Sequence, residues 1–137
     1  MRAEEGQARK DGEGEGALMP TFRLDLPPSA NHGYKMAIHG SAVRGWRPAM
    51  VKTRELEQWE SDAARVVGNW RPPKHRSLAM RIVIALPRDI FRRRDIDGMV
   101  KFLTDATVGR RADQWVDRLE VVKTVGDGWA DVSVETI

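Results

Sequence analysis

The chain contains no cysteine among its 137 residues. Disulfides and thiolate-bound metals are therefore excluded, and any metal must be held by oxygen or histidine ligands. Long apolar runs are also missing, because no stretch approaches the roughly 20 residues that a membrane-spanning helix needs. Hydrophobic residues make up 41% of the chain and charged residues 31%, a balance typical of soluble proteins. We therefore expect a cytoplasmic protein with no membrane partner.

Large apolar residues are scarce in residues 1–19, which carry three basic and five acidic side chains. Such a segment cannot bury enough surface to offset the entropy of ordering. We predict residues 1–19 as a disordered extension and residues 20–137 as one folded domain. Since the whole chain has a net charge of +3, the folded part carries +5. Eight basic residues and one acid lie in residues 71–94, which favours a polyanion-binding surface, although a solvated charged face has the same composition.

Apolar residues recur with the period of a strand at residues 21–26, 77–87, 115–123 and 129–137. The run 77–87 is apolar on both alternating sets, so we predict a central strand covered on both faces. Because residues 124–128 read TVGDG, the last two strands are predicted to form a hairpin.

Helical spacing of apolar residues begins at Thr53, a predicted N-cap, and again at about Asp95. Residues 29–50 show no sustained period, so we predict a long loop or an irregular arm there. The fold class that follows is mixed α/β (α+β). It has a small mixed sheet of about four strands, two main helices packed on it, and the order β-α-β-α-β-β.

Two aspartates separated by one residue, Asp95 and Asp97, follow the predicted central strand and open the second helix. Helix N-termini favour acidic side chains, so both are explained as caps. Lys101 lies four residues after Asp97, and Asp105 four residues after that, which is also the pattern of an exposed, ion-paired helix face. Functional sites, however, often lie where loops leave the carboxyl ends of buried strands. The residues alone leave both interpretations open.

A third carboxylate, Asp113, precedes the strand predicted from residue 115 and could fold back beside the first two. Three carboxylates without cysteine suit a hard cation such as Mg²⁺ or Mn²⁺. A bound divalent ion would polarise a phosphoryl oxygen and lower the pKa of an attacking water, and Lys101 would stabilise the charge of the transition state. The adjacent arginines suit a phosphate-bearing substrate. The sequence therefore gives a hypothesis of metal-dependent phosphodiester hydrolysis with catalytic residues Asp95, Asp97, Lys101 and Asp113.

The run RRRDIDGMVKFLTDA, followed by ADQWVDRLEVVK, resembles the RusA-type Holliday junction resolvases. The signature of that family is a basic stretch, Asp-x-Asp-Asn, a lysine four residues later, a further Asp, and an Asp ten residues before a strand-ending Lys. In this chain these positions are Asp95, Asp97, Lys101, Asp105, Asp113 and Lys123. The segment LPPSANHGY, residues 26–34, is similar to the Pro-Pro-Ser-x-Asn turn of the family. The resemblance covers about residues 20–137.

The resemblance implies a homodimeric, Mg²⁺-dependent endonuclease that resolves four-way DNA junctions by paired symmetric nicks in recombination and repair. A homodimer suits this substrate, because a two-fold junction is cut at two symmetric phosphates. Members are common in phages and prophages. By position, the metal-site carboxylates are Asp95, Asp97 and Asp113, the catalytic cation is Lys101, and the polar residues around the site are Asn31, Asp105 and Lys123.

The chain departs from the family pattern in two places. Gly98 replaces the Asn of Asp-x-Asp-Asn, which removes an amide and costs up to about 1 kcal/mol relative to alanine in a helix. The connection between Thr107 and Asp113 is also shorter than usual. Neither change removes an expected ligand, so we expect activity to persist. A non-catalytic DNA-binding module and a phosphohydrolase acting on small esters are the competing hypotheses.

Basic residues outside the acidic segment are candidate contacts to the DNA backbone. Such contacts give affinity that depends strongly on salt and carries little sequence information. Trp46, between two arginines, could stack on an unpaired base or anchor its loop. The candidate DNA-binding residues are Lys35, Arg44, Arg47, Lys52, Arg92, Arg93 and Arg94.

Overall fold

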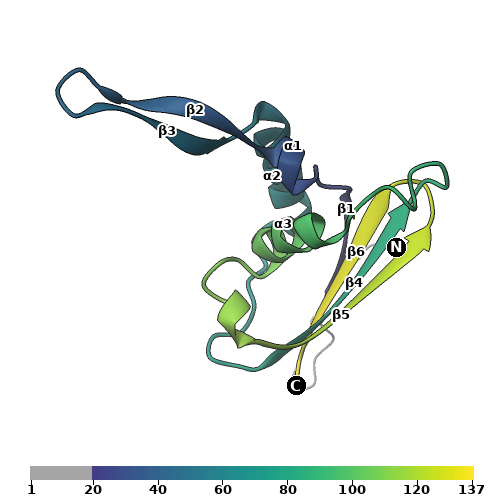
Figure 1. Cartoon of the computed structure of the whole chain (residues 1–137). Helices are drawn as coiled ribbons and strands as arrows, with labels where there is room; N and C mark the ends of the chain where they lie inside the picture. The colour runs from purple at the N-terminus through teal and green to yellow at the C-terminus, as the bar shows by residue number, and fades with distance from the viewer. Residues whose placement is uncertain (1–19) are drawn as a thin grey trace.

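Four strands form a mixed sheet in the order β1-β6-β4-β5, and two further strands pair only with each other (Figure 1). The computed structural model describes residues 20–137, so the predicted disordered extension lies outside the described residues. The mixed α+β fold with a four-stranded sheet and two main helices is confirmed. The elements are β1 (Thr21–Asp25), α1 (Ala30–Gly33), β2 (Tyr34–Ser41), β3 (Gly45–Lys52), α2 (Arg54–Val67), β4 (Leu78–Leu86), α3 (Asp97–Thr107), the 3-10 turn η2 (Asp113–Trp115), β5 (Val116–Val125) and β6 (Trp129–Thr136).

Helices α2 and α3 pack on one face of the sheet and bury its apolar side chains (Figure 1). Ile82 and Ile84 of the central strand β4 point to that face and are fully buried. Arg81 lies on the opposite face, is exposed, and donates to Glu120 at 3.1 Å. The prediction that β4 is central is confirmed. The prediction that both of its faces are covered is confirmed only in part, because Ala79 and Ala85 are buried on the second face whereas Arg81 is exposed there.

On the polar face of the sheet, side chains of neighbouring strands are joined by hydrogen bonds. Arg23 of β1 donates from two nitrogens to the two carboxylate oxygens of Asp131 in β6, at 2.8 and 2.9 Å. This hydrogen bond with Asp131 raises the pKa of the Arg23 guanidinium. Thr21 and Ser133 pair beside them at 2.9 Å. Such cross-strand pairs fix the register of an edge strand.

The last two strands do not form the predicted hairpin. Strand β4 lies between them, parallel to β5 and antiparallel to β6. The chain crosses the end of β4 at Gly126, whose backbone N–H donates to the carbonyl of Leu86 at 2.9 Å. A Cβ at Gly126 would lie 2.6 Å from the Cβ of Ala85, so only glycine allows this close crossing. The stabilisation gained by burying the strongly apolar β4 at the centre of the sheet outweighs the preference of residues 124–128 for a hairpin turn.

Residues 34–52 form an antiparallel hairpin, β2–β3, which extends away from the body of the molecule (Figure 1). We call this hairpin the arm. The prediction of a loop or irregular arm over residues 29–50 is therefore wrong in its local structure, because two regular strands fill most of that range. The arm packs neither face on the body, and the alternation of Met36 and Ile38 with Lys35 and His39 is too short and too close to glycines to predict a strand.

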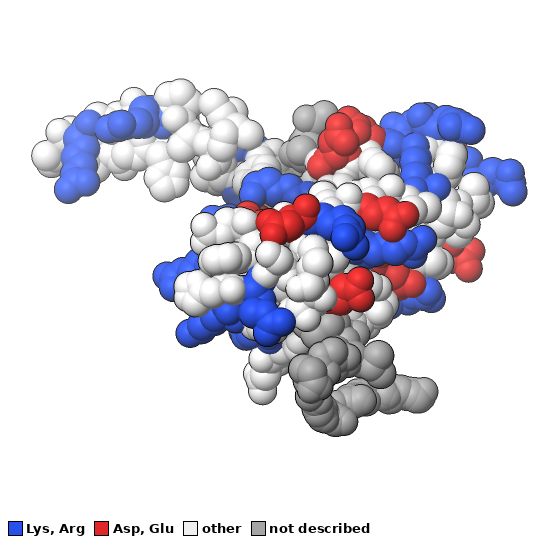
Figure 2. All heavy atoms as spheres, turned by 90° about the horizontal axis from the view of Figure 1, so that it is seen from below, with Lys and Arg blue, Asp and Glu red and all other residues white. Residues whose placement is uncertain are grey.

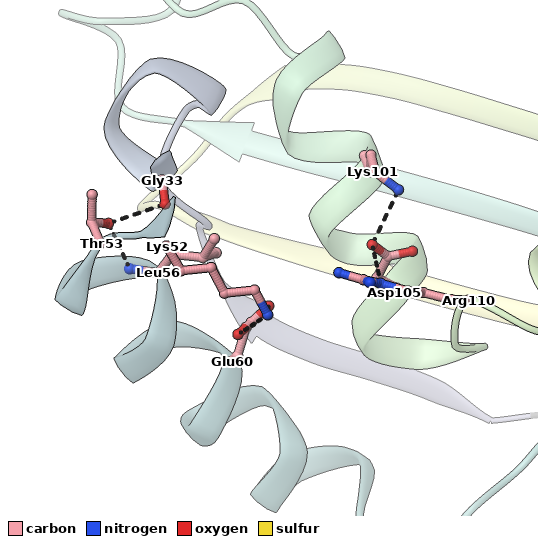
Figure 3. A network of polar contacts seen from close by, with 8 residues as sticks. All are labelled: Gly33, Lys52, Thr53, Leu56, Glu60, Lys101, Asp105 and Arg110. Atoms are coloured by element: carbon pink, nitrogen blue, oxygen red, sulfur yellow. Dashed lines mark hydrogen bonds and ion pairs between the residues drawn. The ribbon is translucent and has the colours of Figure 1, made fainter. Parts of the chain in front are cut away.

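The root of the arm is fastened to the helices by polar contacts (Figure 3). The backbone N–H of Thr53 donates to the carbonyl of Gly33 at 2.9 Å. The Thr53 hydroxyl accepts from the backbone N–H of Leu56 at 3.2 Å, which confirms the predicted N-cap of α2. Lys52 donates to both carboxylate oxygens of Glu60 at 3.0 Å. Because these contacts join β3 to α2, the arm leaves the body in a fixed direction.

Among residues 20–137, no helix is both long and apolar enough to cross a lipid bilayer.

Replacing Gly33 by alanine is expected to lower the free energy of unfolding by about 1–3 kcal/mol. A Cβ there would lie 2.8 Å from Cζ of Phe102, whose ring is buried and cannot move away freely. Urea unfolding followed by circular dichroism measures the loss. The matched control is Gly98→Ala in α3, which is expected to stabilise by about 0.5–1 kcal/mol because alanine is the better helix former. Equal unfolding midpoints for Gly33→Ala and the wild type would contradict the packing described here.

Candidate functional site

The aspartate pair lies where the chain leaves the central strand and enters α3. Strand β4 ends at Leu86, a loop spans residues 87–96, and α3 begins at Asp97. Ile96 is the N-cap residue of α3, and from the position before it the Asp95 Oδ1 atom accepts from the backbone N–H of Asp97 at 3.1 Å, so Asp95 satisfies the first free N–H of the helix. Both side chains are exposed. Within the described residues, the Asp97 carboxylate makes no hydrogen bond or ion pair, and it is therefore available to a ligand.

The loop before the pair is held in place by two partly buried cations. Lys123 of β5 donates to the carbonyl of Arg94 at 3.1 Å, and its ammonium group lies 4.6 Å from the centre of the Phe91 ring. Arg94 donates to the carbonyl of Pro27 at 3.2 Å, and its Nε atom is buried without a partner. The two side chains thus fix the backbone immediately before Asp95. Lys123, predicted to lie near the site, supports it through the loop.

Two of the three adjacent arginines remain free to meet a ligand. Arg92 and Arg93 are exposed and form no ion pair within the described residues; Arg93 donates to the carbonyl of Asp89 at 3.3 Å, and Arg92 lies 5.0 Å from the centre of the Phe91 ring. Arg94 is instead partly buried and bound to the protein itself. The exposed guanidinium groups of Arg92 and Arg93 thus lie within five residues of Asp95 and Asp97 along the chain, where the loop enters α3. Phosphate binding is the usual use of such arginines.

Lys101 and Asp105 pair with each other on the exposed face of α3 (Figure 3). Lys101 Nζ lies 3.3 Å from Asp105 Oδ2, and Arg110 approaches the same oxygen at 3.8 Å. No ion pair joins Lys101 to Asp97 in the part of the chain that the structure describes. The Lys101 side chain is 65% exposed, so solvent screens its ion pair and the side chain is free to change partner.

Asp113 lies beyond the far end of α3 from the aspartate pair. It opens the turn η2 and is exposed. It lines a hollow of about 620 Å³ together with Lys74, His75, Arg110, Arg111 and Trp115. Over residues 20–137, no three His, Asp or Glu side chains gather into a group that could hold a metal ion. The structure therefore brings Asp95 and Asp97 together and does not bring Asp113 to them.

The donor chemistry of the aspartate pair by itself fits Mg²⁺. This ion takes oxygen ligands, keeps several waters, and is commonly bound through one or two carboxylates together with substrate phosphates. Asp97 offers both of its oxygens and Asp95 the oxygen that does not cap the helix. Asn31, expected near the site from its sequence position, has a side chain outside the described residues.

The arm carries the remaining candidate cations. Lys35, Arg44 and Arg47 are exposed, whereas Lys52 is bound to Glu60 at the root. No acidic residue occurs between Asp25 and Glu55, and the arm shows basic and uncharged side chains but no acidic ones on the face in view in Figure 2. These cations were predicted singly as DNA contacts, but not as parts of one acid-free segment. The sequence feature that marks this basic segment is the absence of acidic residues from 26 to 54.

Comparison with models of known protein families finds no match. Comparison with curated proteins finds none either. The function is therefore inferred from the residue pattern and the geometry of residues 20–137.

Proposed function

We propose that the chain is an endonuclease that cleaves four-way DNA junctions with the help of Mg²⁺. The observation that carries the proposal is the loop between β4 and α3. It carries two exposed arginines, Arg92 and Arg93, and leads into α3, where the Asp97 carboxylate makes no hydrogen bond or ion pair within the described residues. The residue pattern that resembles the RusA-type resolvases falls on this same loop and helix. The proposal also takes the active form to be a cytoplasmic homodimer, since a two-fold junction offers two equivalent phosphates.

The charged residues of the loop and of α3 have separate parts in the proposed reaction. Asp95 and Asp97 would hold the ion, and Mn²⁺ has the same ligand preference. When bound, a divalent ion polarises a phosphoryl oxygen and lowers the pKa of a coordinated water. Arg92 and Arg93 would hold the flanking phosphates against the repulsion of the carboxylates. Lys101 would act as the catalytic cation after leaving Asp105. Asp113 has no part in this scheme within one chain.

Cleavage of synthetic junctions tests the proposal. A mobile four-way junction and a linear duplex of the same sequence, each with one labelled strand at a time, are incubated with the protein in Mg²⁺ or in excess EDTA. We expect symmetric nicks in opposing strands of the junction, none in EDTA, and at most weak nicking of the duplex. Equal cleavage of junction and duplex would contradict junction specificity. Hydrolysis of small phosphate esters without DNA cleavage would favour the phosphohydrolase hypothesis.

A non-catalytic DNA-binding module is the second candidate. It is favoured by the hydrogen bond from the Asp97 backbone N–H to Asp95, which gives Asp95 a structural role without any metal. Binding of the junction in EDTA, with no cleavage in Mg²⁺ or Mn²⁺, would support this candidate and contradict the endonuclease.

A further inference from the structure

The two faces of the arm differ sharply in character. Cross-strand partners in an antiparallel pair share a face, and neighbours along a strand alternate. One face carries the apolar pairs Met36–Met50, Ile38–Pro48 and Gly40–Trp46. The other carries the pairs Lys35–Val51, Ala37–Ala49 and His39–Arg47. The arm is thus a ribbon with one apolar and one partly cationic face.

The apolar face is open to solvent along its length. Met36, Ile38, Trp46 and Met50 are each more than 60% exposed. A two-stranded hairpin alone is marginally stable in water, and contiguous exposed apolar surface is typical of a binding site. Tyr34 at the root packs against the buried Phe102 with the two ring centres 5.9 Å apart, so among the described residues the body contacts the arm at its base. The exposed part is therefore built to contact something other than its own domain.

Charge identifies the chemistry of the partner. The arm carries Lys35, Arg44 and Arg47 free of ion pairs within the described residues, and no acid lies between Asp25 and Glu55. An open hollow of about 440 Å³ on the arm is lined in part by His39, Arg44 and Arg47. The partner must therefore be an anion, and it must also offer flat apolar surface. Nucleic acid provides both, since its phosphates meet the cations and its bases meet the apolar side chains.

The geometry points to a wedge, by which we mean the apolar face of the arm inserted among the bases of DNA. A two-stranded ribbon fits a DNA groove, and side chains such as Ile, Met and Pro enter between unstacked base steps. Trp46 is 66% exposed and adjacent to Arg47, so the earlier alternative that it anchors its loop is wrong. We propose that the arm lays its apolar face against unpaired bases at the branch point of a junction. Trp46 stacks on a base, and Arg44 in the turn and Arg47 on the opposite face contact the phosphates that flank the ribbon. This inference rests on the proposed junction substrate and adds a second contact region, remote from Asp97.

Junction binding measured without cleavage tests the wedge. A four-way junction with 2-aminopurine at the branch point is titrated with protein in EDTA, so that catalysis has no influence. Wild-type protein is expected to change the 2-aminopurine fluorescence as it binds. Trp46→Ala is expected to lose that change and to bind about 5- to 150-fold more weakly, while Trp46→Phe retains most of both. Arg47→Ala is expected to weaken binding and to reduce the salt dependence by about one phosphate contact.

Val43→Ala is the matched control. Val43 is 95% exposed in the turn of the arm, outside the paired apolar face, so its removal is expected to leave binding and fluorescence unchanged. Because Trp46 is also exposed, unfolding curves of Trp46→Ala and the wild type are expected to coincide. Circular dichroism verifies that the variant is folded before its affinity is interpreted.

The outcomes separate the wedge from the nuclease. If Trp46→Ala binds the junction and changes its fluorescence as the wild type does, the wedge is refuted and the cleavage proposal stands. If the wild type binds no junction, both are refuted.

Two other partners for the apolar face are also tested. Loss of wild-type dimers in Trp46→Ala during sedimentation would assign the face to a second copy. Loss of binding to anionic phosphatidylserine vesicles, with junction affinity unchanged, would assign it to a lipid surface. Either result overturns the wedge.

Discussion

Replacing Asp97 by asparagine is expected to lower Mg²⁺-dependent cleavage of a four-way junction by about 100-fold or more, the scale on which a site loses rate when one charge-stabilising group is removed. Asparagine has nearly the same shape, but it lacks the charge that a divalent ion needs. The carboxylate is exposed and makes no hydrogen bond or ion pair within the described residues, so the change breaks no contact in the fold. Initial rates of nicking at saturating protein measure the loss, and gel-shift titration in EDTA is expected to show unchanged junction affinity.

A pair of substitutions at Asp95 separates its capping role from its proposed ligand role. Asparagine caps helices about as well as aspartate, so Asp95→Asn keeps the hydrogen bond to the Asp97 backbone while removing the charge. It is expected to abolish cleavage and to cost less than about 1 kcal/mol of stability. Asp95→Ala removes the cap as well and is expected to cost about 1 kcal/mol.

The control for both positions is Asp127→Asn, a neutralised carboxylate in the exposed turn between β5 and β6. Its cleavage rate is expected to match that of the wild type. If Asp97→Asn and Asp127→Asn cleave equally well, the carboxylates of the loop are caps and nothing more. The endonuclease would then need another site.

Shortening Leu103 to alanine is expected to lower the free energy of unfolding by about 3–5 kcal/mol. Leu103 lies on the buried face of α3 and is fully buried in the core between the helices and the sheet. The loss combines the removed apolar contact with the cavity left behind, because a close-packed core relaxes only in part. Such a loss is a large fraction of the total stability of a domain, which is about 5–15 kcal/mol. Urea unfolding, with the slope compared between variants, measures it.

Val66→Ala in α2 is the matched control for this substitution. Val66 is also an apolar residue of a helix, but it is 50% exposed. Its truncation is therefore expected to change the free energy of unfolding by less than about 0.5 kcal/mol. A small effect at Leu103 as well would mean that α3 is not packed on the sheet. Since α3 begins at Asp97, that result would also remove the basis for a fixed position of the aspartate pair.

Much of the fold could be predicted because burial leaves a period in the sequence. Phe22 and Leu24 alternate with polar residues in β1, and Leu56, Trp59 and Ala63 mark the buried stripe of α2. The arm left only a short trace, the alternation of Met36 and Ile38 with Lys35 and His39, because neither of its faces is packed on the domain. The order of strands was also hidden, because a Gly-rich turn is a local feature and the insertion of β4 between β5 and β6 is a long-range one.

The candidate site could be predicted only where it depends on residues that are close together in the sequence. Asp95 and Asp97 are two residues apart, so any helix that begins there keeps them together. Asp113 is separated from them by the length of α3, and its position depends on how the chain turns at residues 108–112. The inward turn of Arg94 toward Pro27 joins residues 67 positions apart and has no sequence signal. Local spacing therefore predicted the pair, and tertiary packing decided the rest.

The strand order also has a consequence for how the protein is made. The partner of β1 is β6, and Thr21 contacts Ser133 across 112 positions of the chain. At about 5–20 residues per second of synthesis, β1 waits roughly 5–20 s before its partner exists. During that time Phe22 and Leu24 have no strand to pair beside, and one edge of β4 is open to other chains. The sheet can close only as a late, cooperative step, and the nascent chain is most prone to aggregate just before β6 leaves the ribosome.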